Sequence, residues 1–243
     1  MKFIAAIIIL FVVSSASAAD KPCVAIQPHP QSPSLPVVLR AWAQPGNFWN
    51  QRATLRVRFL AGTSRQKTEA WKRMQVIDSL VNLTFVQVTS GPSEIRVRFD
   101  RGKGHWSYLG RGCLTVPQSS QTMNLELVAG VFGDSSAEWD RVTLHETLHA
   151  IGFEHEHQSP LATSLVWNKE AVYSYYGQTQ GWSRQEIDFQ VLNRSTARSY
   201  VTTGFDLKSI MEYPIPNGLA NVVVGWNDKL TASDVALAKR IYP

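Results

Sequence analysis

The sequence predicts an α+β fold in which an upper lobe, with a twisted mixed β-sheet and two long helices, precedes an irregular lower lobe with a C-terminal helix. Two patterns predict it. Strand-like alternation and helix-like spacing of apolar residues follow one another up to residue 152, and loops predominate after it. At 243 residues, 44% of them hydrophobic, the chain is also long enough to bury a sizeable core.

The upper lobe begins with strands and a helix in alternation. Residues 54–60 alternate apolar and polar side chains, as a half-buried strand does. Ser64 is a candidate N-cap, and apolar residues then recur at helical spacing over 67–81. Further strands are expected at 83–88, 94–99 and 122–127. This order of elements favours a mixed sheet.

A second long helix is expected at 138–151, because Gly152 supplies a typical C-terminal stop. Thr231 is a candidate N-cap for the last helix. Helical segments of the lower lobe are expected at 169–176, 183–191 and 233–241.

The first residues have the pattern of a secretory signal peptide. A positive start precedes an apolar run at 3–13, and small residues ending in Ala-Ser-Ala at 16–18 form a cleavage pattern. The run is shorter than the roughly 20 residues that a membrane-spanning helix needs. The sequence therefore predicts a signal peptide at 1–18 and a secreted, extracellular chain without membrane association.

The remaining chain divides into an arm and one domain. Five prolines between residues 20 and 36 disfavour helix and central strand, so 19–37 is expected to be an extended arm. The domain is expected at 38–243, with its upper lobe at 38–152 and its lower lobe at 153–243. The net charge of +5 comes from scattered basic residues rather than a run, which argues against a nucleic-acid partner.

The segment from His145 to His155 has the pattern HExxHxxGxxH. Residues four apart lie on one face of a helix, so His145 and His149 can present two imidazoles to one ion. Gly152 allows the chain to turn, and the turn can return His155 as a third ligand. Three protein nitrogens with an open fourth position are typical of one catalytic zinc ion.

Glu146 follows the first ligand and can act as general base on a metal-bound water. Zinc lowers the pKa of such a water to about 7 and polarises a carbonyl group. An accidental cluster of ordinary histidines is the alternative, but four of the six histidines fall between 145 and 157. His157 has no ligand spacing and is expected to be structural or solvent-facing, and His29 and His105 also lack metal spacing.

Two cysteines leave several hypotheses open. Cys23 and Cys113 can form one disulfide in an exported protein. Cys23 can instead be a free thiol, or a thiolate ligand that blocks the zinc in a latent form.

Segments on both sides of the metal motif, together with the motif itself, resemble a known family. Residues 152–157 and the Ser-Ile-Met-Glu-Tyr segment at 209–213 resemble the zinc motif and Met-turn of the astacin-like family in the metzincin clan. The segment that contains Trp106, Ser107 and Tyr108 resembles its substrate-binding edge strand, and 230–235 resembles the start of its last helix. The resemblance covers about residues 38–243 and implies a metzincin-like zincin fold with the active-site cleft between the lobes.

The resemblance also implies roles for single residues. Met211 would be an apolar floor under the zinc, and Tyr213 a displaceable metal ligand that swings to stabilise the oxyanion. Residues 106–108 would pair with extended substrate as an added strand. Glu156 would be a buried carboxylate near the mature N-terminus, and 214–218 would line the pocket beyond the scissile bond.

The chain departs from the family pattern in ways typical of an outlying branch, similar to secreted microbial or fungal members. Glu212 stands where the family usually has His, and His105 stands where it has a disulfide cysteine. Gln-Ser-Pro at 158–160 replaces an Arg- and Asp-rich continuation. A long pro-segment is not expected.

These observations together predict a monomeric zinc metalloendopeptidase that acts on protein or peptide substrates. An exopeptidase is disfavoured, because no charged group to hold a free peptide terminus is evident. The alternatives are a zinc-binding but inactive or narrowly specific module with the same fold, and a metal-free structural protein. A zinc assay separates the last of these from the others.

Overall fold

The computed structural model describes residues 24–26, 43, 45–127, 135–196 and 200–243. The predicted signal peptide, Cys23, His29 and most of the predicted arm lie outside these residues. Within the part of the chain that is described, no helix is long and apolar enough to cross a membrane.

Six strands form one mixed sheet, as predicted, in the order β1-β5-β6-β4-β2-β3. Neighbouring strands are parallel except β5 and β6, which are antiparallel. The strands are β1 (Val24–Ile26), β2 (Thr54–Phe59), β3 (Thr84–Gln87), β4 (Ile95–Arg98), β5 (Trp106–Tyr108) and β6 (Met123–Asn124).

The described residues also form five α-helices, of which α1 and α2 contact the sheet. They are α1 (Ser64–Asp78), α2 (Ser136–Ala150), α3 (Lys169–Gln180), α4 (Arg184–Ile187) and α5 (Ala232–Ile241). Short 3-10 helices lie at η2 (Pro45–Asn47), η3 (Gly110–Thr115) and η4 (Glu156–Gln158), and a π-helix, η5, spans Asp188–Leu192. The two long helices expected from the sequence are therefore α1 and α2, with 15 residues each.

The start of α1 corrects the expectation that Ser64 is its N-cap. Thr63 is the N-cap: its hydroxyl accepts a hydrogen bond from the Gln66 N–H, and the Gln66 side chain accepts one from the Thr63 N–H. This reciprocal capping box places Ser64 inside the helix, three residues before the predicted start. Thr231 does cap α5, in a similar box with Asp234.

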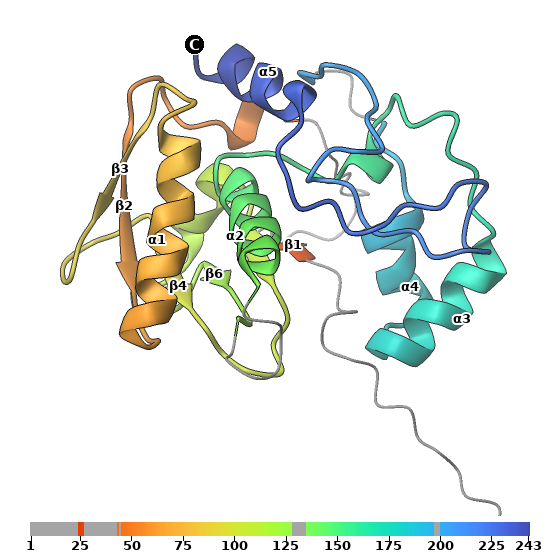
Figure 1. The fold of residues 1–243 in the computed structure, drawn as a ribbon, viewed down its shortest axis with the longest axis horizontal. Helices are drawn as coiled ribbons and strands as arrows, with labels where there is room; N and C mark the ends of the chain where they lie inside the picture. The colour runs from red at the N-terminus through yellow and green to blue at the C-terminus, as the bar shows by residue number, and fades with distance from the viewer. Residues whose placement is uncertain (1–23, 27–42, 44, 128–134, 197–199) are drawn as a thin grey trace, which may run out of the picture.

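Two large apolar cores form among the described residues. In the first, α1 and α2 pack beside the sheet, as Figure 1 shows, and α5 adds Leu237 and Ile241. Tyr242 stabilises this core through two hydrogen bonds. Its hydroxyl donates to the Ile151 carbonyl (2.7 Å) and accepts from the Trp49 N–H (3.2 Å). The second core gathers around α3, η5 and the loops that follow them, which form the irregular lower lobe.

Candidate metal centre

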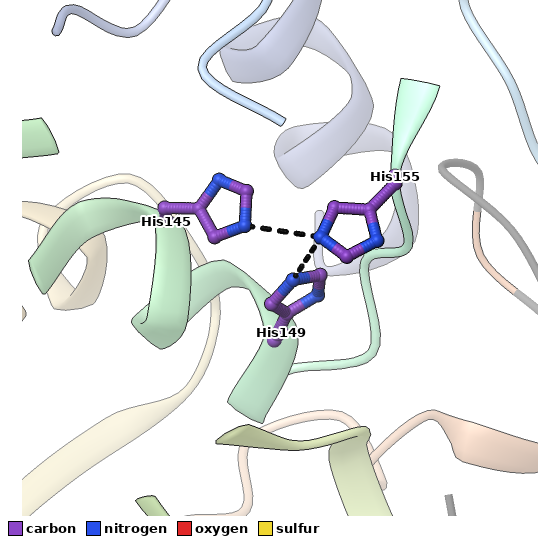
Figure 2. Close-up of side chains that lie close together, drawn as sticks. All are labelled: His145, His149 and His155. Atoms are coloured by element: carbon purple, nitrogen blue, oxygen red, sulfur yellow. Dashed lines mark hydrogen bonds between the residues drawn. The ribbon is translucent and has the colours of Figure 1, made fainter. Parts of the chain in front are cut away.

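Three histidine side chains converge where α2 ends (Figure 2). His145 and His149 project from α2, one turn apart, and His155 returns from the segment after it. The Nε2 atom of His155 lies 3.3 Å from that of His145 and 3.1 Å from that of His149. All three side chains are buried. In the described part of the chain, they form the group of potential metal ligands whose ligand atoms lie close enough together to hold one ion.

The turn that returns His155 depends on Gly152. Its N–H bonds the His149 carbonyl and the next N–H, of Phe153, bonds the Leu148 carbonyl, which is the hydrogen-bond pattern of a Schellman motif. Gly152 has φ +101°, a conformation that side chains other than glycine strongly disfavour. A Cβ there would also lie 3.3 Å from the Phe48 ring. The sequence therefore ends α2 where a sharp turn can bring the third imidazole to the first two.

Backbone carbonyls set the orientation of the first two imidazoles. Nδ1 of His145 lies 2.7 Å from the Ile210 oxygen, and Nδ1 of His149 lies 2.6 Å from the Phe153 oxygen. Because a carbonyl oxygen only accepts hydrogen bonds, each Nδ1 carries the proton and each Nε2 turns a lone pair to the centre. Burial lowers the pKa of His145 well below its ordinary value and the pKa of His149 to about 4. Both rings are thus in the neutral form that binds metal at neutral pH.

The distances fit one zinc ion. Tetrahedral zinc with Zn–N bonds of about 2.0–2.1 Å requires nitrogen atoms about 3.3–3.4 Å apart. The observed Nε2 separations of 3.1 and 3.3 Å are close to this value. Lone pairs that face one another so closely repel unless a cation lies between them, and imidazole is a preferred zinc ligand. His145, His149 and His155 therefore form the site of one zinc ion.

Glu146 is fully buried and follows His145 on α2. Because α2 is a regular 15-residue helix in the first core, the carboxylate and the first ligand are held by the same rigid element. This position is consistent with the predicted role of Glu146 as general base.

The segment at 209–213 passes directly beside the metal ligands. The Ile210 carbonyl holds His145, and the Met211 carbonyl accepts from the Glu156 N–H (3.1 Å). Met211 is buried in the first core, whereas Tyr213, two residues later, is buried in the second. The Tyr213 ring centroid lies 4.3 Å from that of His155. The turn thus places a side chain from each core beside the centre.

Asp234 was not foreseen as a site residue, although it supports this turn. Its carboxylate accepts hydrogen bonds from the Ser209 hydroxyl and the Ile210 N–H, as well as from Thr231. The Thr-x-x-Asp spacing predicts its role as a helix cap. Its hydrogen bond with the Ser209 hydroxyl joins residues 25 positions apart, and no local sequence pattern indicates it.

Glu156 is buried beside other acidic side chains. Burial, with the carboxyl groups of Glu212 and Asp234 nearby, raises the pKa of Glu156 to about 9. Its predicted proximity to the mature N-terminus concerns residues outside the described ranges and stays a prediction.

The outer edge of β5 is occupied by the chain itself. Trp106, Ser107 and Tyr108 pair antiparallel with β6 on one side and parallel with β1 on the other. Val24 lies opposite Trp106 in this register, and Ile26 lies opposite Tyr108. The strand that was expected to pair with substrate therefore already has a partner on both sides.

A small pocket that opens to solvent adjoins His145. Of the predicted lining at 214–218, Pro214 contributes, together with Tyr213. Arg141 and Trp226 were not foreseen: the guanidinium lies over the indole ring at 4.1 Å and pairs with Glu138. These two residues come from α2 and from a distant loop, which explains why no local pattern indicated them.

The other histidines and the cysteine have structural surroundings. His157 is fully buried, which excludes the solvent-facing alternative, and His105 accepts a hydrogen bond from the Glu126 N–H. Cys113 is buried without a disulfide to any described residue, and burial raises the pKa of its thiol to about 12. Pairing with Cys23 lies outside the described residues and stays a hypothesis.

Comparison with known proteins connects this geometry to a family. A sequence model of the peptidase family described as Astacin matches residues 42–224. A structure of myroilysin shares 33% identity, covers 83% of this chain and 98% of its own, and has a TM-score of 0.77. A second, titled as a crystal structure of myroilysin, shares 32% identity over 82% and 87%, with a TM-score of 0.60.

A more distant structure shows the same fold. High choriolytic enzyme 1, a hatching enzyme zinc-protease from the medaka fish Oryzias latipes, shares 17% identity over 79% of this chain and 92% of its own, with a TM-score of 0.54. At this identity the likeness concerns the fold alone. The search of curated proteins returned no match.

Proposed function

The chain belongs to the astacin family of zinc metallopeptidases, and from this premise we propose that it is a secreted endopeptidase with Glu146 as its general base. The observation that carries the proposal is the convergence of three buried imidazoles on one point, with a buried carboxylate next in sequence to the first. Secretion rests on the signal-peptide pattern at 1–18.

Zinc held in this way supplies a Lewis acid and lowers the pKa of a bound water to about 7. A Glu146 carboxylate oxygen takes the proton from the attacking water and delivers it to the nitrogen of the departing amine. His145 and His149 stay fixed during these steps, because their Nδ1 protons remain bonded to backbone carbonyls. The rigid helix thus keeps base and ligands in one geometry.

Tyr213 and β5 complete the proposed site. The Tyr213 hydroxyl donates a hydrogen bond to the carbonyl oxygen of the substrate as negative charge develops there. The contact of its ring with His155 supports this role, because it places Tyr213 beside the metal ligands. Substrate pairs with the outer edge of β5 as an extended strand once β1 has left that edge.

Hydrolysis of denatured casein by the chain that starts at residue 19 tests this proposal. We expect activity that a zinc chelator abolishes, and that Glu146→Gln lowers at least about 10²-fold while zinc content stays near one per chain. Glu170→Gln, at an exposed glutamate on α3, is the matched control and should retain full activity. A folded, zinc-loaded wild type that cleaves neither casein nor a peptide library would contradict the proposal and favour the inactive binding module.

A further inference from the structure

His157 and Glu212 face each other behind the metal centre. Nδ1 of His157 lies 3.3 Å from Oε1 of Glu212, and both side chains are fully buried. His157 follows the third metal ligand by two positions in the sequence. Glu212 stands between Met211 and Tyr213. A polar group that is taken out of water needs a polar partner, and each of these two side chains offers one to the other.

The second nitrogen of His157 is also bound. Nε2 lies 3.1 Å from the Gln190 carbonyl oxygen in the π-helix η5. Since this oxygen can only accept, Nε2 carries a proton and Nδ1 is directed at Glu212. The neighbouring Gln158 amide donates to the Phe189 carbonyl of the same helix (2.7 Å), so the segment is anchored twice. The His157 ring therefore has one fixed orientation.

Both members of the pair contact Tyr213. The ring centroids of His157 and Tyr213 lie 4.5 Å apart at an interplanar angle of 39°. Glu212 Oε1, which faces His157, also accepts the Tyr213 N–H at 2.9 Å. The tyrosine ring thus contacts both His157 and the metal ligand His155, whose own ring centroids lie 5.4 Å apart. Its backbone is held by the same carboxyl oxygen.

We propose that His157 and Glu212 are positioning residues, which hold the Tyr213 ring in the orientation from which its hydroxyl reaches the reacting carbonyl. The proposal rests on the role assigned to Tyr213 in the proposed function. The π-helix carbonyl fixes His157, His157 and Glu212 fix each other, and together they fix the ring and backbone of Tyr213. A displacement of about 1 Å in such a group can cost about 10²-fold in rate.

A double-mutant cycle between Glu212 and Tyr213 tests this coupling. Glu212→Leu removes both contacts at similar volume, whereas Glu212→Gln keeps an acceptor for Tyr213 and a polar partner for His157. We expect Glu212→Leu and Tyr213→Phe each to lower kcat by about 10- to 100-fold with little change in KM. The double variant should be no slower than Tyr213→Phe alone, and Glu212→Gln should stay close to wild type. Losses that multiply in the double variant would overturn the proposal.

A matched cycle uses residues on α3, away from the centre. Tyr173→Phe removes a hydroxyl that is bonded to Asp188, and Glu170→Leu removes an exposed carboxylate. Neither change should alter kcat when made alone. Combined with Glu212→Leu, neither should change kcat beyond the effect of Glu212→Leu itself. If Glu212→Leu fails to fold, His157→Leu replaces it in the cycle, because it breaks the same pair from the other side.

A spectroscopic measurement separates failure of this inference from failure of the proposed function. In zinc-loaded protein with ring-labelled tyrosine, the Tyr213 signals are identified by their loss in Tyr213→Phe. We expect Glu212→Leu to shift these signals, Glu212→Gln to leave them near their wild-type positions, and the Tyr173 signals to stay unchanged in both. Unchanged Tyr213 signals in Glu212→Leu would overturn the positioning role even if the wild type cleaves casein.

Discussion

Removal of strand β1 should relieve competition for the edge of β5. Residues 24–26 pair in parallel with residues 106–108, which are the residues proposed to bind extended substrate. Substrate can use this edge only in molecules from which β1 has detached. The chain that starts at residue 27 lacks this competitor, whereas the chain that starts at residue 19 retains it.

The size of the effect follows from the pairing. Three residues in parallel register form about two or three backbone hydrogen bonds, each with a net contribution of about 0.5–1.5 kcal/mol. The pairing is therefore stabilised by about 1–4 kcal/mol, which corresponds to a detached fraction lower by about 5-fold to 10³-fold. An apparent affinity falls in proportion to the competent fraction, so the KM of the longer chain should be higher by the same factor.

Michaelis constants of the two chains on one fluorogenic peptide measure this directly. We expect a lower KM and an unchanged kcat for the chain that starts at residue 27. A synthetic peptide of residues 19–30 should inhibit that chain competitively, and a scrambled peptide should not. Equal KM values would refute the reasoning. A change in kcat alone would instead favour blockage of the metal by Cys23, which Cys23→Ser would then relieve.

Three further predictions concern the metal centre and its support. Gly152→Ala should lower the free energy of unfolding by about 1–3 kcal/mol and weaken zinc binding, because φ is +101° there; an unchanged melting temperature and zinc affinity would contradict this. Asp234→Ala should cost about 1–3 kcal/mol, measured by urea unfolding, since it leaves the buried Ser209 hydroxyl and Ile210 N–H without their acceptor; a smaller loss than for an exposed Asp→Ala control would refute it. In the metal-free protein the pKa of His149 is about 4, below its ordinary 6.5, so the folded state binds fewer protons than the unfolded state between these values. Its stability should therefore fall as the pH is lowered from 6.5 to 4, and less so in His149→Gln; a pH-independent difference between the two would contradict this.

The metal ligands were predictable because their signal is local. Helical spacing places His145 and His149 on one face of α2, and glycine at 152 is required by the backbone itself. The error at the start of α1 was also local. Thr63 and Ser64 are both good caps, but only Thr63 has a glutamine three residues later to complete the box.

The remaining features depend on residues that are distant in the sequence. Strand β1 lies in a Pro-rich stretch with no strand signal, and it exists through its pairing with β5, about 80 residues away. The contact of His157 with Glu212 and that of Arg141 with Trp226 likewise join segments that only the folded chain brings together. Such partners cannot be identified from the spacing of residues along one element.

The division of the turn between two cores has an evolutionary consequence. Met211 and the helix that carries two metal ligands belong to the first core, whereas Tyr213 and Ile215 belong to the second. Substitutions that repack the second core can therefore shift Tyr213 without disturbing the helix that binds the metal. In descendants of this chain, substitutions that change metal retention should therefore fall mainly at other positions than those that change the catalytic rate through Tyr213. The two residues between Ile210 and Tyr213 mark the boundary between these two sets of positions.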